Sequence, residues 1–421
     1  MPSQLEGSLA VARTVARCRP EVVCAYPITP QTHIVEALSR MVAGGELAPC
    51  EFVNVESEFA AMSVAIGASA TGARAYTATA SQGLLYMAEA LFNASGLGLP
   101  IVMTVANRAI GAPINIWNDH SDAMALRDCG WVQLYASDNQ EAADMHVLAF
   151  RLAQECSLPV MVCMDGFVLT HAFEPLEVAE QELVDAYLPR FAPRQALDPD
   201  EPVTIGAMVG PEAFTEVRYL AHAKQMDALD AIPALADELA DRCGRRSGEL
   251  LGAYRCADAA TVIVALGSVF GTLCEVVDEL RAAGRSAGAL AVKSFRPFPR
   301  EELRAALAGA SRVIVLERAF SVGVGGIVSA DVHAALAGLH VPVHTVIAGL
   351  GGRAITRRSL HALVEQACAG TLADPHFLDL DTAVVERELA RSRAGGRTGG
   401  RPGPHAENIL RDLGIVAAGP V

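Results

Sequence analysis

The sequence predicts an α/β protein built around two sheets of mainly parallel strands. Short apolar runs alternate with amphipathic or Ala-rich stretches through residues 21–165, and the same alternation begins again at residue 260. The runs are continuously apolar, which is typical of parallel strands covered by helices on both faces. The chain has 421 residues, 52% of them hydrophobic, so it can form two or three domains with separate cores.

Six strands and four helices are predicted in the first half. The strands are Val22–Tyr26, Glu51–Val55, Ala73–Ala78, Pro100–Ala106, Trp131–Ala136 and Pro159–Met164; the helices are Ile34–Val42, Glu58–Ala70, Gln82–Ser95 and Gln140–Glu155. Ligands of parallel sheets bind outside the carboxyl ends of the strands. Polar residues follow these ends, and they are Thr29, Glu56, Glu58, Ser81, Gln82, Asn107 and Arg108. We therefore expect the functional site at this edge of the sheet.

A second α/β unit is predicted over residues 258–352, after a connection at 186–257. The connection contains a proline-rich stretch and a charged helix at 213–243. The unit has strands at 261–267, 288–294, 311–318 and 341–352, and helices at 271–283, 301–308 and 327–339. The domains are thus 1–185, 186–257, 258–352 and 353–421. The last of these combines a flexible Gly/Arg-rich segment with a short terminal helix, which is either a disordered tail or an arm on a neighbouring subunit.

Charge and cysteine content restrict the function. The formal net charge is −15 and is spread along the chain, which argues against nucleic acid or an anionic membrane as the main partner. The N-terminal stretch carries charges, and no apolar run is long enough for a membrane span, so we expect a cytoplasmic protein. None of the ten cysteines has Cys-x-x-Cys spacing, so we expect mostly buried free thiols and no iron–sulfur cluster on this chain.

Glu58 is the leading candidate for proton chemistry. It opens an otherwise almost wholly apolar helix, where a desolvated carboxyl would be a good proton donor near neutral pH. The structural alternative is an acidic residue interacting with the helix dipole. Glu56 could equally be the buried carboxylate.

Other motifs allow both structural and functional interpretations. Ser81 is either an N-cap or part of a helix N-terminus that faces an anion or a polar ring. Arg108 is either a surface residue or a bidentate partner for a carboxylate. The NIWNDHSD loop at 115–122 indicates a hydrogen-bonded polar loop rather than a metal site, and SVGVGG at 321–326 indicates a structural strand-to-helix turn.

Five motifs occur in one order along the chain. They are Tyr26-Pro-Ile-Thr-Pro30, Glu56-Ser-Glu58, Thr79-Ala-Ser-Gln-Gly83, Asn107-Arg108 and the Asn-Asp-His-Ser-Asp loop. The set strongly resembles the α subunit of the 2-oxoacid:ferredoxin oxidoreductases, the pyruvate:ferredoxin oxidoreductase family. The resemblance covers residues 20–175 and continues more weakly through the second domain, where FRPFP at 295–299 fits.

The resemblance implies a thiamine diphosphate enzyme whose active site is shared between chains. Residues 1–185 look like a pyrimidine-binding domain, and 258–352 look like the transketolase C-terminal type. The Gly-Asp-Gly motif that holds Mg²⁺ on the diphosphate is absent, so a β subunit would supply that end and this chain would bind no metal. The implied partners are this β subunit, a γ subunit and an iron–sulfur ferredoxin-like subunit, assembled as a dimer of hetero-oligomers.

The resemblance also implies roles for individual residues. Glu58 would hydrogen-bond N1′ of the aminopyrimidine ring. Thr29, fixed by its flanking prolines, would contact the substrate, and Arg108 would pair with the substrate carboxylate. The remaining implied contacts are Pro27, Ser81, Gln82 and Gly83 for the cofactor and Asn118 for the substrate.

The implied reaction is oxidative decarboxylation of a 2-oxoacid to an acyl-coenzyme A and CO₂, with electrons passed to iron–sulfur clusters on partners. Pyruvate is the common substrate, and a larger acid, including an aryl one such as phenylglyoxylate, is equally permitted. The acceptor could be ferredoxin, flavodoxin or NAD. The alternatives are a non-redox thiamine diphosphate enzyme, transketolase-like or a decarboxylase, and a non-catalytic scaffold subunit.

Overall fold

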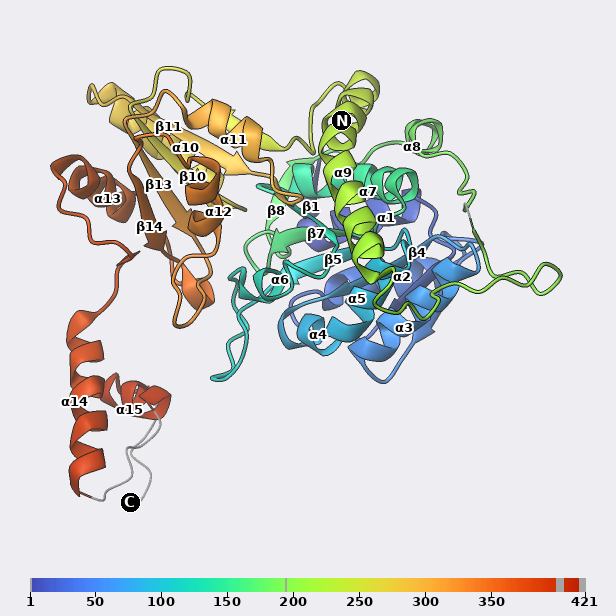
Figure 1. The fold of residues 1–421 in the computed structure, drawn as a ribbon, viewed down its shortest axis with the longest axis horizontal. Coiled ribbons are helices and arrows are strands. Elements are labelled where there is room, and N and C mark those ends of the chain that lie inside the picture. The colour runs from blue at the N-terminus through green and yellow to red at the C-terminus, as the bar shows by residue number, and fades with distance from the viewer. Residues whose placement is uncertain (1, 194, 399–404, 416–421) are drawn as a thin grey trace. The chain divides into compact units, whose positions relative to one another are not determined.

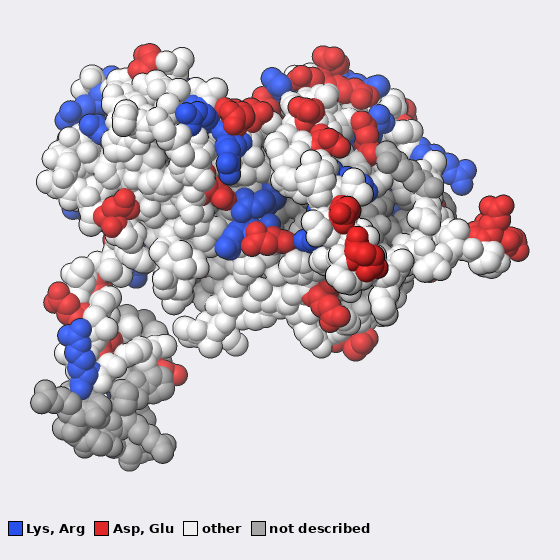
Figure 2. Space-filling view, in the orientation of Figure 1, with Lys and Arg blue, Asp and Glu red and all other residues white. Residues whose placement is uncertain are grey.

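The computed structural model describes residues 2–193, 195–398 and 405–415. The chain forms two compact units, Met1–His376 and Phe377–Val421 (Figure 1). The first unit contains both predicted sheets. Acidic and basic side chains are interspersed over the face shown in Figure 2, in agreement with a charge that is spread along the sequence.

The first sheet has seven strands in the order β12-β6-β7-β5-β4-β2-β3. Its strands are β2 (Val22–Ala25), β3 (Glu51–Asn54), β4 (Ala75–Thr79), β5 (Val102–Asn107), β6 (Val132–Tyr135), β7 (Val160–Asp165) and β12 (Ser294–Arg296). All pairings are parallel except that of β12 with β6. The six predicted strands are therefore confirmed, with ends shifted by one or two residues.

Helices cover both faces of this sheet because neighbouring strand residues point to opposite sides. In β2, Val23 packs in one core with α1 (Gly7–Arg17), α2 (Thr32–Ala43) and α7 (Asn139–Cys156). Cys24 packs in the other core with α3 (Glu58–Ala70), α4 (Ser81–Tyr86) and α5 (Ala88–Gly96). The single helix predicted over Gln82–Ser95 is wrong, because the chain leaves helical geometry at the buried Met87 between α4 and α5.

The second sheet has the order β15-β14-β13-β10-β11-β9. Its strands are β9 (Leu251–Tyr254), β10 (Thr261–Ala265), β11 (Ala287–Val292), β13 (Arg312–Glu317), β14 (Val343–Ile347) and β15 (His376–Phe377). The four predicted strands are β10, β11, β13 and β14, and all their pairings are parallel. The surrounding helices are α10 (Val269–Ala282), α11 (Arg300–Leu307), α12 (Val328–Ala335) and α13 (Arg357–Ala369) (Figure 1). The antiparallel edge strand β9 was not predicted, since it lies in the expected connection.

One strand joins the two sheets. The run predicted as a single strand at 288–294 ends as β11 at Val292, and β12 then pairs with β6 of the first sheet, Ser294 opposite Leu134. The start of the FRPFP motif thus belongs to the first sheet although the chain around it belongs to the second.

The remaining elements of the first unit flank the sheets. They are β1 (Ser3–Glu6), α6 (Ser121–Ala125), β8 (Phe173–Leu176), α8 (Gln181–Tyr187), α9 (Phe214–Cys243) and a short 3₁₀ turn, η1 (Leu350–Gly352). Strands β1 and β8 form an antiparallel pair. Helix α9 was predicted almost to the residue.

The SVGVGG turn is structural, as predicted. Ser321 and Gly325 close a tight loop, and the Glu317 carboxylate accepts hydrogen bonds from the amides of Ile327 and Val328, both at 2.7 Å. A protein carboxylate therefore occupies the start of α12, where a phosphate would otherwise bind.

The second unit contains α14 (Thr382–Thr398) and α15 (His405–Asp412). The predicted terminal helix is α15. The predicted flexible Gly/Arg segment continues α14 as far as Thr398, and the next six positions lie outside the described residues. Within the described parts of the chain, no helix combines the length and the apolar character needed to cross a membrane.

The ten cysteines are free thiols. Cys18, Cys24, Cys129 and Cys163 are buried, and the other six are half-buried, so the expectation of mostly buried thiols is only partly met. Burial raises the pKa of Cys18 and of Cys24 to about 12, which keeps both thiols protonated and unreactive.

Candidate active site

The loop between the two prolines is fixed to the end of the first sheet. Gln31 is fully buried, and its Nε2 donates to the carbonyl oxygens of Ala78 (2.8 Å) and Tyr26 (3.1 Å). Pro30 is buried, whereas Pro27 and Thr29 are exposed. The loop therefore holds Thr29 at the surface beside the carboxyl end of β4.

Arg108 links this loop to the polar loop that follows β5. Its Nη1 donates to the Thr29 carbonyl oxygen at 2.9 Å, and its Nε donates to the Asn115 carbonyl oxygen at 3.0 Å. The side chain is buried, which lowers the pKa of Arg108, while the nearby Asp122 carboxylate opposes that shift. The structure thus brings together Thr29 and Arg108, through the threonine backbone rather than its hydroxyl.

Asp122 organises the backbone behind Arg108. Its carboxylate accepts from the amides of Ser81 (2.9 Å), Arg108 (2.9 Å) and Ala123 (2.8 Å) and from Asn107 Nδ2 (2.8 Å). Complete burial raises the pKa of Asp122 to about 6, and the four hydrogen bonds oppose this rise. The sequence predicted Asp122 only as the last residue of the polar loop 115–122, whereas it lies in the first turn of the short helix α6.

Ser81 does not cap a helix with its side chain, so that interpretation is wrong. The N-cap position of α4 is Ala80, and Ser81 is the first helical residue with a left-handed φ of 50°. Its hydroxyl donates to the Ala109 carbonyl oxygen at 2.5 Å and contacts the side-chain oxygen of Gln82. A non-glycine residue in this conformation is strained, and such strain clusters at functional sites.

Glu58, and not Glu56, is the buried carboxylate. It begins α3 after the N-cap Ser57, whose Oγ accepts from the Ala60 amide at 3.2 Å, whereas Glu56 is exposed. Among the described residues, none forms a hydrogen bond or an ion pair with the Glu58 side chain. Thr79 Oγ1, which is also buried, has no partner there either.

Gly83 lies against both of these groups. A Cβ at this position would be 2.6 Å from Glu58 Oε1 and 2.7 Å from Thr79 Oγ1. The missing side chain of Gly83 therefore leaves room for a buried carboxylate and a hydroxyl to lie against its backbone, and we call this arrangement of Glu58, Thr79 and Gly83 the cradle. A planar ring with a hydrogen-bonding nitrogen, such as the aminopyrimidine of thiamine diphosphate, fits these donors and acceptors.

We expect Gly83→Ala to abolish cofactor binding, because the added methyl group occupies the cradle and collides with the Glu58 carboxylate. Gly67→Ala is the matched control: Gly67 lies in the helix that Glu58 begins, and nothing lies within 4 Å of a Cβ there. The control is expected to raise helix stability by about 0.5–1 kcal/mol. Calorimetric titration of the assembled protein with thiamine diphosphate checks both; equal affinity in the two variants would contradict the cradle.

A second polar group ties the carboxyl ends of the two sheets together. Asp165, at the end of β7, pairs with Arg318 Nη1 (2.6 Å) and His120 Nε2 (2.7 Å) and accepts from the Ser268 amide (3.0 Å) and hydroxyl. Burial by itself would raise the pKa of Asp165, but Arg318 and His120 hold it well below its ordinary value. This group was not predicted, although Asp165 comes directly after the predicted strand Pro159–Met164 and Arg318 is the last residue of the predicted strand 311–318.

The other predicted contacts are dispersed. Gln82 extends towards the loop after β5, where a Cβ on Gly111 would lie 2.5 Å from its Nε2. Asn118 is buried, and its amide oxygen accepts from Arg318 Nη1 (2.9 Å) and Nη2 (3.1 Å). Asn118 is thus bonded to Arg318, which follows strand β13 of the second sheet, and not to Thr29. The loop is hydrogen-bonded, as predicted, and its polar side chains have different partners.

This fold is that of the thiamine-diphosphate-binding class of α/β proteins. Residues 13–236 match the family described as "Pyruvate flavodoxin/ferredoxin oxidoreductase, thiamine diP-bdg", and residues 259–360 match "Pyruvate:ferredoxin oxidoreductase core domain II". The chain belongs to the pyruvate:ferredoxin oxidoreductase family of 2-oxoacid:ferredoxin oxidoreductases.

Similar proteins are single subunits of named enzymes. The pyruvate synthase subunit PorA of Methanosarcina barkeri is 49% identical over 90% of this chain and 97% of its own length. PorA of Methanothermobacter thermautotrophicus is 44% identical over 86% of this chain and 94% of its own length. The ketoisovalerate oxidoreductase subunit VorA of Pyrococcus horikoshii is 40% identical over 86% of this chain and 92% of its own length.

A solved structure shares the fold. The 2-oxoglutarate:ferredoxin oxidoreductase of Magnetococcus marinus, with 2-oxoglutarate, coenzyme A and succinyl-CoA bound, matches with a TM-score of 0.66 at 21% identity. The match covers 87% of this chain and 65% of that chain, so this chain spans about two thirds of the solved one.

Proposed function

We propose that this chain is the α subunit of a 2-oxoacid:ferredoxin oxidoreductase and holds the aminopyrimidine end of thiamine diphosphate. The observation that carries the proposal is the buried Glu58 carboxylate, which lies against Gly83 and has no hydrogen-bond or ion-pair partner among the described residues. The similarity to PorA and VorA subunits supports the same assignment.

The residues of this chain would bind and orient the reactants. Glu58 would hold a proton between its carboxylate and the N1′ nitrogen of the aminopyrimidine, and its burial would limit exchange of that proton with bulk water. Bound thiamine diphosphate supplies the nucleophilic carbon and the electron sink for decarboxylation. Pro27, Ser81, Gln82 and Gly83 would line the ring.

Thr29 and Arg108 would bind the substrate. Arg108 uses two of its N–H groups to hold the loops, and among the described residues no partner is assigned to the others. Those remaining groups would pair with the substrate carboxylate, while the exposed Thr29 hydroxyl contacts the carboxylate or the keto oxygen. Asn118, which accepts hydrogen bonds from Arg318, would hold the 115–122 loop in place beside the substrate.

The other half of the active site would come from partner subunits. A β subunit would hold the Mg²⁺-diphosphate end, because this chain has no Gly-Asp-Gly motif. A γ subunit and an iron–sulfur ferredoxin-like subunit would complete a dimer of hetero-oligomers in the cytoplasm. Electrons would pass to ferredoxin, flavodoxin or NAD, and coenzyme A would take the acyl group.

The substrate we propose is a short aliphatic 2-oxoacid, with pyruvate first. The relatives named for pyruvate and ketoisovalerate support an aliphatic acid, and phenylglyoxylate remains the aryl case to test. Two measurements distinguish the alternative functions. A non-redox decarboxylase or transketolase-like enzyme would reduce no electron acceptor. If the chain is a scaffold subunit, a substitution at Glu58 would leave turnover unchanged.

Reconstitution tests the proposal. The purified single chain is expected to oxidise no 2-oxoacid and to bind thiamine diphosphate weakly, since the diphosphate end is missing. Co-expression with the β subunit should restore binding, and addition of the γ and iron–sulfur subunits should restore coenzyme A-dependent reduction of a viologen dye. The assay compares pyruvate, ketoisovalerate, 2-oxoglutarate and phenylglyoxylate. Tight stoichiometric cofactor binding by the single chain would contradict the proposed division of the site.

A further inference from the structure

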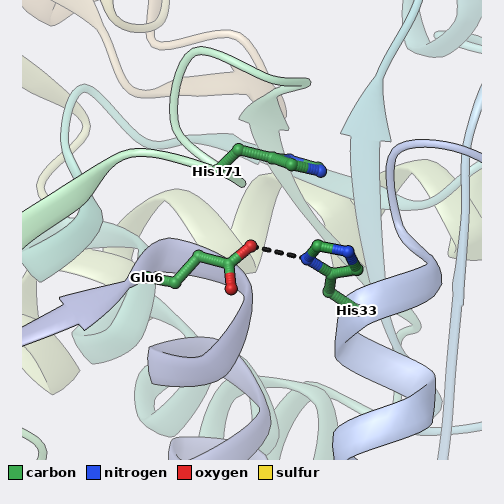
Figure 3. Close-up of side chains that lie close together, drawn as sticks. All are labelled: Glu6, His33 and His171. Carbon is green, nitrogen blue, oxygen red and sulfur yellow. Dashed lines mark hydrogen bonds and ion pairs between the residues drawn. The ribbon is translucent and has the colours of Figure 1, made fainter.

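Three potential metal ligands converge from three separate segments of the first unit (Figure 3). Glu6 ends β1, His33 lies in the first turn of α2, and His171 lies in the turn after β7. One ligand atom from each lies within 4.8 Å of the other two. Among the described residues, no other group of three or more His, Cys, Asp or Glu side chains meets this distance.

The backbone around Glu6 and His171 forms one rigid frame. The amide of Gly7 donates to the Ala172 carbonyl oxygen at 3.0 Å, and the amide and hydroxyl of Ser8 both donate to the Thr170 carbonyl oxygen, at 2.9 and 2.8 Å. These bonds continue the antiparallel pairing of β1 with β8. The positions of Glu6 and His171 relative to each other are therefore fixed before any ligand binds.

The His171 ring is oriented by its neighbours. Its Nδ1 is 2.7 Å from Thr170 Oγ1. The ring packs at a tilt of 37° against Phe167, with centroids 4.8 Å apart, and at a tilt of 35° against His33, with centroids 4.7 Å apart. A hydroxyl partner on Nδ1 leaves Nε2 as the ligand atom. An oxygen acceptor on the second ring nitrogen is the usual companion of a metal-binding histidine.

His33 and Glu6 are already in contact across the site. His33 Nδ1 lies 2.6 Å from Glu6 Oε1, as the dashed line in Figure 3 shows. His33 is exposed, and a pocket of about 240 Å³, lined by Glu6, Leu9, His33, Glu36, Ala37 and Arg40, lies beside it. A bound ion would thus have solvent on one side, with room for a water ligand.

We propose that Glu6, His33 and His171 bind a divalent transition-metal ion of the Zn²⁺ type. Two imidazoles and one carboxylate with an open fourth position are a common ligand set for this ion. The ion would take the place of the hydrogen bond between His33 and Glu6. Ligand atoms of tetrahedral zinc are roughly 3.3 Å apart. A pair now as much as 4.8 Å apart would therefore close by about 1.5 Å, while His33 Nδ1 and Glu6 Oε1, now 2.6 Å apart, would separate slightly to admit the ion.

Such an ion would restrain the substrate loop. His33 follows Thr29 by four positions, and Gln31 between them is fixed to the first sheet. The ion would fasten the start of α2 to the N-terminal strand and to the turn after β7. The sequence predicted no metal ion on this chain, and the titration below decides between that prediction and this site, which is independent of the Mg²⁺ expected on the partner.

Cobalt(II) titration of the untagged full-length chain tests the site. We expect one Co²⁺ per chain, seen as visible absorption bands of tetrahedral Co²⁺, which one equivalent of Zn²⁺ displaces. His33→Ala and His171→Ala should each weaken binding by about tenfold or more, and Glu6→Gln should do the same. His361→Ala is the matched control, because His361 forms a similar 2.6 Å pair with Glu279 without a third ligand.

A thermal measurement on the unmodified chain covers the case in which a variant fails to fold. Zn²⁺ at saturating concentration should raise the Tm of the wild-type chain and of His361→Ala. Absence of stoichiometric Co²⁺ binding at micromolar concentration would overturn the proposal. So would equal loss of binding in His361→Ala and His171→Ala, or a wild-type Tm that Zn²⁺ leaves unchanged.

Discussion

Glu58→Gln is expected to lower the turnover number of the assembled enzyme by about 100-fold or more, while the subunit still folds and assembles. Glutamine has nearly the same shape, so the contact with Gly83 and the start of α3 are preserved. It cannot exchange a proton with a ring nitrogen as a carboxyl group does. We therefore expect the turnover number to fall while the affinity for the cofactor stays the same.

Glu56→Gln is the control for this experiment. Glu56 is exposed and lies two positions before Glu58 in the same Glu-Ser-Glu motif, so its substitution makes an identical change of charge. Turnover with pyruvate and a viologen acceptor, with assembly checked by size-exclusion chromatography, should be normal in this variant. Near-normal turnover of Glu58→Gln would remove Glu58 from the mechanism and favour a scaffold role.

The sequence predicted the elements that depend on local patterns. Continuous apolar runs located the strands of both parallel sheets, and helix α3 begins at Glu58 as its acidic first turn indicated. The rule that ligands bind at the carboxyl ends of parallel strands led to Thr29, Ser81 and Arg108. The structure connects these three through Asp122 and the Thr29 carbonyl oxygen.

What the sequence could not predict depends on contacts between distant segments. Strand β12 is only three residues long and pairs with a strand about 160 positions earlier in the chain. Whether Glu56 or Glu58 is buried, and that Ser81 bonds to the Ala109 carbonyl instead of capping α4, follows from tertiary packing. The Glu6, His33 and His171 cluster likewise arises only when β1 pairs with β8.

Asp165→Asn is expected to destabilise the first unit by about 3–5 kcal/mol, because it leaves the buried Arg318 guanidinium without its anionic partner. The Asp165 carboxylate also accepts from Ser268 and contacts His120, so a single substitution disturbs its contacts with Arg318, Ser268 and His120 at once. Thermal and urea unfolding of the full-length chain at pH 7 measure the effect.

The control and the pH dependence make this prediction specific. Asp258→Asn breaks an ion pair with Arg281 of the same length, 2.6 Å, but Asp258 is exposed, so that variant should unfold like wild type. Because the pKa of Asp165 is held below its ordinary value, its stabilising effect is complete above the unfolded-state pKa of about 3.9 and is lost as the pH falls through the lower folded-state pKa. The difference between wild type and Asp165→Asn should therefore be constant from pH 7 to about pH 5 and should shrink below about pH 4. A difference that grows on acidification, or an equal loss in Asp258→Asn, would show that Asp165 does not hold the two sheets together as an ionised carboxylate.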